Sequence, residues 1–322
     1  MTPLNIKSKI KNFFTIPEEV FKEEKTKKFE QIKLCSISRN NLFFGIIAFL
    51  ILVNILVFFN INQFYIRAIL GFIFIITIPG LLIMLMLKIR SVGFWEYLVY
   101  TIGLSVSFIM FGGLAVNWIL PWLNITDKPL ALLPVLTCFN IFLLSFWLIA
   151  FIKNQDLKPL KISFPKLDIT NQIFFIVPVI FPVLSVLGAF ILNNHGPNYL
   201  TMIMLGGIAI YVFCVVWFRD KLNENVYPWA LWLMGLSLLL MYSLRSWYFM
   251  GSDVISEYHF FDLVTKNNLW DINSYAHSYN TCLSVNVLPT ILNLSIGVEQ
   301  LVLFKLFIQL IFSVILIVLY LL

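Results

Sequence analysis

The sequence predicts an all-α polytopic membrane protein with about eight transmembrane helices and one outer acidic loop that carries short amphipathic helices. Of its 322 residues, 60% are hydrophobic and only 12% are charged. The mean hydropathy of +0.91 lies far outside the range of soluble globular domains. Apolar runs of roughly 20 residues recur along the chain, and this length matches the hydrocarbon thickness of a bilayer.

Short polar segments separate the expected spans. The spans cover about residues 41–60, 67–87, 95–119, 130–152, 172–192, 199–218, 227–246 and 298–322. In the second span, Pro79 removes a backbone donor and Gly80 loosens the helix, so we expect a kink or a re-entrant break. Before the first span, residues 1–40 form a basic segment of mixed charge, which could be helical from Glu18 onward.

The basic residues are distributed unevenly between the two sides of the membrane. With the N-terminus in the cytoplasm, the inner segments hold 17 Lys and Arg and the outer segments hold four, which are Arg67, Lys128, Arg245 and Lys266. The positive-inside rule therefore predicts a multi-pass protein of the cell membrane with a cytoplasmic N-terminus and an extracytoplasmic loop at 247–297. Because the basic residues flank apolar spans, membrane lipids are expected partners and nucleic acid is not.

Two further patterns bear on the class of protein. The four cysteines show no C-x-x-C spacing, so the sequence indicates neither a disulfide framework nor a zinc site. The sequon Asn124-Ile125-Thr126 lies in an expected outer segment, where N-glycosylation is available. A second sequon, Asn293-Leu294-Ser295, adjoins the eighth span.

Carboxylates gather in one stretch between the seventh and eighth spans. Asp253, Glu257, Asp262 and Asp271 lie there with His259, in a chain that is otherwise poor in charge. If a helix starts at Ser252 or Asp253, the first two carboxylates project from one face of it. The region from Leu283 to Ile296 is apolar but too short to span, and it fits an interfacial or re-entrant element.

The second and third spans carry an Arg-x-x-Leu-Gly run, a Pro-Gly break, a Glu, and a Gly-Leu-Ser in the next helix. These are Arg67 to Gly71, Pro79-Gly80, Glu96 and Gly103-Leu104-Ser105. With this pattern, residues 45–120 resemble a small prokaryotic membrane module of unknown function. The resemblance says little about chemistry. The order of the expected spans divides the chain into the basic segment 1–40, a six-span membrane module at 41–226 and a remaining part at 227–322.

The last part of the chain carries a series of short motifs, namely Gly251-Ser252-Asp253, Glu257-Tyr258, Trp270-Asp271, Tyr279-Asn280, Leu283-Ser284, Leu288-Pro289 and Phe304-Lys305. With these motifs, residues 245–320 resemble an archaeal family of uncharacterised membrane proteins that is similar to the C-type (GT-C) polyprenyl-phosphate-dependent glycosyltransferases. The resemblance implies that 227–322 is the start of a GT-C-like domain and that Asp253 and Glu257 occupy its acidic motif. Family members continue with more spans, and the eighth span ends without a polar flank, so we expect an N-terminal fragment.

Transfer from a lipid-linked sugar needs a base for the acceptor hydroxyl and positive charge for the departing phosphate. Asp253 is the candidate base, and Glu257 could share its proton, orient it, or hold a divalent metal with it. The structural alternative is that Asp253 caps a helix and Glu257 favours its first turn through the helix dipole.

The candidate substrate-binding residues are Lys305, Arg245 and Trp270. A cation within the last span is costly unless it snorkels to the interface or faces a polar cavity, so Lys305 could bind a phosphate or reach the interface. Arg245 could contact a lipid phosphate or ordinary headgroups. Trp270 could stack on a sugar or belong to the aromatic belt at the interface.

Two functions from different classes remain open. The first is a glycosyltransferase that uses a polyprenyl-phosphate-linked sugar donor on the extracytoplasmic face, with a divalent metal as an open question. The second is a non-catalytic membrane protein, such as a transporter component, an assembly scaffold or an inactive fragment. A transporter typically shows inverted repeats with helices broken at matching positions, and the Pro79-Gly80 pair has no clear counterpart here.

Overall fold

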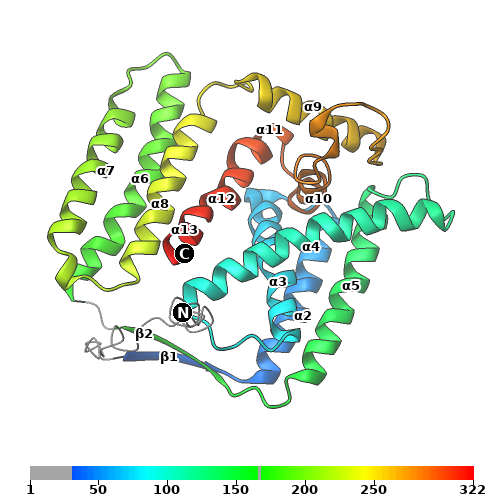
Figure 1. Ribbon diagram of the computed structural model, residues 1–322, viewed down its shortest axis with the longest axis horizontal. Coiled ribbons are helices and arrows are strands. Elements are labelled where there is room, and N and C mark those ends of the chain that lie inside the picture. Colours follow the sequence, from blue (N-terminus) through cyan, green and yellow to red (C-terminus); the bar gives the residue numbers. More distant parts are fainter. Residues whose placement is uncertain (1–30, 166–167) are drawn as a thin grey trace, which may run out of the picture.

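The computed structural model describes residues 31–165 and 168–322 and confirms the all-α polytopic fold (Figure 1). In these residues, eight helical segments are long and apolar enough to cross a membrane. The first seven are α2 (Arg39–Phe58), α3 (Ile66–Met86), α4 (Phe94–Trp122), α5 (Leu132–Lys153), α6 (Ile169–Asn193), α7 (Tyr199–Trp217) and α8 (Val226–Ser243).

The eighth span, Gln300–Leu321, is assembled from four consecutive helical pieces. They are α11 (Gln300–Val302), a π-helical turn η5 (Leu303–Phe307), α12 (Ile308–Ser313) and α13 (Ile315–Leu321). Between α8 and this span lie α9 (Ser252–Asn267), the 3-10 turn η4 (Ser278–Thr281) and α10 (Val287–Ile296). Two more 3-10 turns, η2 (Gln63–Tyr65) and η3 (Arg219–Lys221), precede α3 and α8.

A two-stranded antiparallel ladder joins the segment before α2 to the segment between α5 and α6, at the end of the bundle opposite α9 (Figure 1). β1 (Gln31–Ile37) pairs with β2 (Leu160–Pro165). The expectation of a helix running on from Glu18 is therefore wrong for residues 31–37, and its residues 18–30 lie outside the described part. The reason is visible in β2, where Leu, Ile and Phe alternate with Lys and Ser, which is the two-residue period of a strand.

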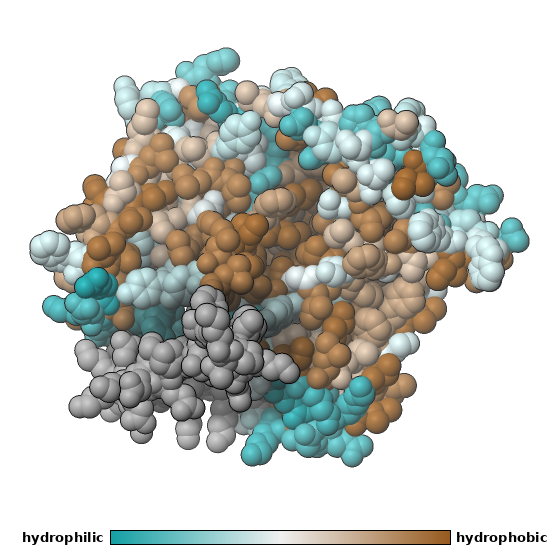
Figure 2. Space-filling view, viewed as in Figure 1, coloured by the Kyte–Doolittle hydropathy of each residue, from teal (hydrophilic) through white to brown (hydrophobic). Residues whose placement is uncertain are grey.

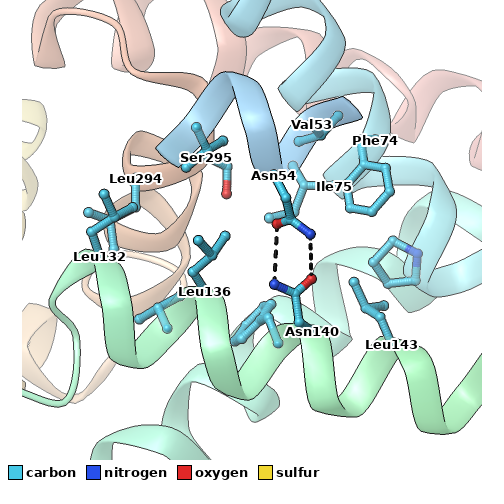
Figure 3. Close-up of a pocket in the computed structure, with 14 residues that line it drawn as sticks. Val53, Asn54, Phe74, Ile75, Leu132, Leu136, Asn140, Leu143, Leu294 and Ser295 are labelled. Atoms are coloured by element: carbon cyan, nitrogen blue, oxygen red, sulfur yellow. Dashed lines mark hydrogen bonds between the residues drawn. The ribbon is translucent and has the colours of Figure 1, made fainter. Parts of the chain in front are cut away.

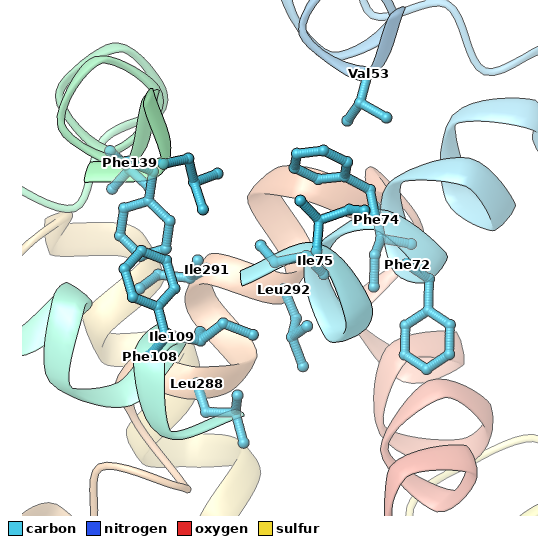
Figure 4. Packing of buried hydrophobic residues seen from close by; sticks show 14 of the residues in the cluster. Val53, Phe72, Phe74, Ile75, Phe108, Ile109, Phe139, Leu288, Ile291 and Leu292 are labelled. Atoms are coloured by element: carbon cyan, nitrogen blue, oxygen red, sulfur yellow. The ribbon is translucent and has the colours of Figure 1, made fainter. Parts of the chain in front are cut away.

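Two buried clusters organise the bundle. The larger one unites α2 to α5 with α9, α10 and the start of the last span, and Figure 4 shows Phe72, Ile109, Phe139 and Ile291 within it. The smaller one joins α6, α7 and α8 around Phe181. The boundary between 41–226 and 227–322 stays a prediction, and each cluster includes residues from both sides of it.

Helices α3 and α4 meet where the sequence places its Pro-Gly pair. The sequence predicts a kink or a re-entrant break at this pair. Helix α3 is continuous through Pro79, so the re-entrant break does not form, and the kink stays a prediction. The backbone N–H of Gly80 donates to the hydroxyl oxygen of Ser105 across 2.8 Å. A Cβ at position 80 would lie 1.8 Å from the carbonyl oxygen of Thr101, so only glycine permits this approach.

Helix α10 is a ten-residue apolar helix packed against α3, α4 and α9. It ends at Gly297, which has a φ of +66°. The buried guanidinium of Arg67 donates to the carbonyl oxygens of Leu294 and Ser295 and contacts Asn60. This cation satisfies the last carbonyls of α10 and complements the negative end of its dipole.

The exposed surface of the bundle is largely apolar. Figure 2 shows apolar side chains across the middle of the molecule, with hydrophilic ones gathered toward its ends. Large apolar side chains are exposed on several of the spans, and they include Phe44, Phe111, Ile203 and Phe213. In water this surface would be costly, and in a bilayer it contacts lipid chains. The protein is therefore a multi-pass membrane protein.

Candidate functional site

Helix α9 begins with a sharp turn at Gly251, whose φ of +103° is one that residues with a side chain rarely adopt. Gly251 is the N-cap, and no side chain caps the helix. The interpretation of Asp253 as the N-cap is therefore wrong, because Asp253 lies within the first turn. There its charge is favoured by the helix dipole and its carboxylate remains available for other contacts.

A cluster of aromatic side chains packs α9 against the last span. Phe261 is fully buried, and its ring lies 5.2 Å from that of Phe304 in the π-helical turn. The Tyr258 ring packs against both Phe249 and Phe304, and its hydroxyl donates to Gln300 Oε1 across 2.6 Å. These contacts hold α9 along the end of the bundle.

The two candidate carboxylates lie one turn apart on α9, as the sequence predicts. Asp253 is exposed and Glu257 is half-buried. Burial raises the pKa of the Glu257 carboxyl, and the neighbouring Asp253 carboxylate raises that pKa further. The Glu257 carboxyl therefore holds its proton more tightly than an isolated surface carboxyl would.

Tyr279 lies next to this pair, although it is 26 residues from Asp253 in the sequence. Partial desolvation raises the pKa of its phenol, and the nearby carboxylates of Asp253 and Glu257 raise that pKa further. The ring of His277 lies 5.2 Å from the Tyr279 ring, and His277 Nδ1 accepts the Tyr279 backbone N–H. We take Asp253, Glu257 and Tyr279 as the candidate site.

Two buried asparagines hold the backbone of the loop that places Tyr279 beside the carboxylate pair. The Asn280 amide donates to the carbonyl oxygens of Asp271, Ile272 and Tyr275. The Asn286 amide donates to three more carbonyls, including those of Tyr279 and Asn280. Amide groups of this kind satisfy backbone that no helix or strand can pair.

Trp270 is part of this framework and is only 5% exposed. Its indole N–H donates to the carbonyl oxygen of Asn280 across 2.9 Å. Its backbone exchanges two hydrogen bonds with the buried Asn117 side chain of α4, at 2.8 and 2.9 Å. The indole is thus enclosed by protein and positions the loop, whereas sugar stacking needs an open ring face.

Lys305 is 6% exposed and lies in the π-helical turn of the last span. Its ammonium donates to the carbonyl oxygens of Ser246 at 2.7 Å, Tyr248 at 2.6 Å and Arg245 at 3.4 Å. An ammonium has three donors, so these carbonyls occupy all of them. Lys305 therefore anchors the chain that leaves α8, while the Arg245 side chain is exposed.

The carboxylate pair could take part in holding a hard cation. No group of three or more His, Cys, Asp or Glu suited to a metal occurs in residues 31–165 and 168–322. Mg²⁺, however, is commonly held by one or two carboxylates together with water and substrate phosphate. Asp253 and Glu257 fit that smaller requirement.

A cavity of about 50 Å³ lies elsewhere, between α2, α3, α5 and α10 (Figure 3). Its walls are apolar except for Ser295 and for Asn54 and Asn140, whose amides exchange two hydrogen bonds at 2.8 and 3.2 Å. None of the residues that line it belongs to the candidate site. The amide pair joins α2 to α5 within the span region, as polar side chains do between membrane helices.

Fold and site together define a polytopic helical membrane protein that carries a carboxylate pair and a tyrosine on segments outside its spans. Comparison of the chain with protein-family models, curated proteins and solved structures finds no match. The function therefore has to be argued from the residues of the site.

Proposed function

We propose that the protein is a membrane glycosyltransferase that takes a sugar from a polyprenyl-phosphate-linked donor on the extracytoplasmic face. The observation that carries the proposal is the grouping of Asp253, Glu257 and Tyr279 at one end of the bundle. The resemblance of residues 245–320 to a family that is similar to the GT-C enzymes supports it, because that resemblance puts Asp253 and Glu257 in the acidic motif. The 17-to-4 distribution of basic residues supports the extracytoplasmic orientation of loop 247–297 and the cell membrane as location.

In the proposed reaction, Asp253 accepts the proton of the acceptor hydroxyl. The acceptor oxygen then forms a bond to the anomeric carbon of the sugar, while the bond from that carbon to the phosphate oxygen breaks. The polyprenyl phosphate leaves with the electron pair. The Tyr279 hydroxyl orients the Asp253 carboxylate, and Glu257 shares the proton with Asp253 or holds a divalent cation with it.

The departing phosphate needs positive charge nearby. Lys305 already binds three carbonyls, so the exposed Arg245 is the better candidate for this contact. In this proposal Lys305 positions the backbone of residues 245–248, and Trp270 positions the loop before Tyr279. Both act on the site through other residues.

The test is transfer of a labelled sugar from polyprenyl phosphate in membranes that contain the protein. We expect Asp253→Asn to lower the rate by roughly 10²–10⁴-fold, which is the usual contribution of a general base. Asp271→Asn is the matched control, because Asp271 is an exposed carboxylate of the same loop. Undiminished transfer by Asp253→Asn would exclude it as the base.

The second candidate is a non-catalytic membrane protein, such as a transporter component or an assembly scaffold. The enclosure of Lys305 and Trp270 favours it, because two of the expected substrate contacts serve the fold. Under this alternative, the wild-type protein transfers no sugar from any polyprenyl-phosphate donor, and Asp253→Asn changes only thermal stability. Measuring both quantities on the same preparations separates the two functions.

A further inference from the structure

The turn between α4 and α5 displays the sequon Asn124-Ile125-Thr126. Asn124 is exposed, has a left-handed φ of +54°, and its backbone N–H donates to the Pro121 carbonyl at 2.9 Å. Its side-chain amide makes no hydrogen bond to the described residues. Thr126 Oγ1 accepts the backbone N–H of Lys128 at 3.1 Å, which leaves the hydroxyl hydrogen of Thr126 free.

This turn lies beyond the hydrocarbon part of α4. The helix has 29 residues, and at 1.5 Å per residue it is about 43 Å long, well above the roughly 30 Å of hydrocarbon. Trp118 and Trp122 near its end are 61% and 79% exposed, as is usual for tryptophans at a membrane interface. Asn124 follows them and is therefore in the aqueous or headgroup region.

The same turn belongs to the side of the molecule that carries α9. The backbone N–H of Leu130 donates to the carbonyl oxygen of Asn268, the C-cap residue that follows α9, across 2.9 Å. A few residues before the turn, Asn117 holds the Trp270 backbone. Figure 1 shows the α4–α5 turn and α9 at the end of the bundle away from β1 and β2.

The second sequon, Asn293-Leu294-Ser295, provides an internal contrast. It lies within α10, where Asn293 Oδ1 is buried. The Ser295 hydroxyl donates to the Ile291 carbonyl at 3.0 Å, and the Leu294 carbonyl accepts from Arg67. A helical, enclosed sequon presents neither the amide nor the hydroxyl to an enzyme.

We propose that Asn124 is an N-glycosylation site and that Asn293 is not. An oligosaccharyltransferase of the host supplies a lipid-linked oligosaccharide as the co-reactant. The Asn124 Nδ2 atom gives a proton to a base of that transferase and forms a bond to the anomeric carbon. The bond from that carbon to the lipid phosphate breaks, and the lipid phosphate leaves with the electron pair. Here this chain is the acceptor, so the site is independent of the proposed catalytic one.

The test is expression in a eukaryotic host, followed by intact mass and gel mobility before and after peptide N-glycosidase treatment. We expect one glycan on the wild-type protein and none on Asn124→Gln or Thr126→Val. Asn293→Gln is the matched control and keeps the glycan. A glycan that persists in Asn124→Gln, or a wild-type protein without one, overturns the proposal.

A further variant separates the causes of a negative result. Tyr275→Thr completes a sequon at Asn273, which is exposed in the loop after α9. If Tyr275→Thr gains a glycan and the wild-type protein carries none, the assigned site is wrong although the orientation is right. If neither carries a glycan, the orientation itself is wrong, and the proposal fails with it. Neither result changes the rate of sugar transfer that tests Asp253.

Discussion

Replacing Gly80 with alanine should push helices α3 and α4 apart. The added Cβ would lie 1.8 Å from the carbonyl oxygen of Thr101, whereas ordinary contacts begin near 3.4 Å. The helices can relieve this overlap only by separating, and the separation stretches the 2.8 Å hydrogen bond from Gly80 to Ser105. Because Pro79 precedes this position, α3 already lacks one internal hydrogen bond there.

The cost follows from three contributions. Overpacking of a membrane-helix contact costs about 1–3 kcal/mol, by analogy with protein cores. The weakened hydrogen bond costs about 0.5–1.5 kcal/mol. The higher helix propensity of alanine stabilises the variant by about 0.5–1 kcal/mol. We therefore expect Gly80→Ala to lower the free energy of unfolding by about 2–3 kcal/mol.

The assay is reversible unfolding in mixed micelles, with the fluorescence of the tryptophans as the signal. Gly103→Ala is the matched control, because it lies on α4 close to the same contact and a Cβ there meets nothing within 4 Å. We expect this control to be neutral or more stable by up to about 1 kcal/mol. Equal effects of the two substitutions would refute the close α3–α4 approach.

Three other predictions concern the loop and α10. Asn117→Ala leaves the backbone N–H and C=O of Trp270 without hydrogen-bond partners, and each unpaired buried group costs about 1–3 kcal/mol of stability. Hydrogen exchange at the Trp270 amide should therefore accelerate at least tenfold. Burial and then the Asp253 carboxylate raise the pKa of Glu257 above its ordinary 4.5, so its contribution to stability falls as pH rises from 4.5 through the raised pKa. Melting temperatures against pH should show this fall, and Glu257→Gln should flatten it. Gly297→Ala places a side chain at a φ of +66°, which costs about 1–2 kcal/mol and should lower the melting temperature.

The spans were predictable because each depends on a local quantity, namely an apolar run of sufficient length. All eight expected spans are present in the described residues. The ladder between β1 and β2 was missed, although the alternation in Leu160–Pro165 carries a strand signal. Six alternating residues are a short window, and the surrounding hydrophobicity directs attention to helices.

The site was only half predictable. The spacing of Asp253 and Glu257 places both on one face of a helix from sequence alone, because both belong to the same helix. Tyr279 comes from a different segment, and no periodicity relates it to α9. Its position depends on the Asn280 and Asn286 amides, whose partners are backbone groups that leave no mark in the sequence.

For Lys305, the sequence predicts the kind of partner but not its identity. A cation within a span predicts a polar partner, and the structure provides one in three backbone carbonyls. Carbonyl oxygens and phosphate oxygens both satisfy an ammonium, so the residue type cannot distinguish them. The same holds for Trp270, because the sequence shows that a tryptophan is present but does not show whether its ring is buried or open to a sugar.

The pairing of β1 with β2 has a consequence for the order of assembly during synthesis. The two strands enclose four spans, α2 to α5, and the partner of β1 begins only at Leu160. Translation at 5–20 residues per second needs about 6–25 s to produce the roughly 120 intervening residues. During that interval β1 has no strand to pair with, while α2 to α5 can already pack. The ladder between β1 and β2 therefore forms late, after helices α2 to α5 have packed against one another.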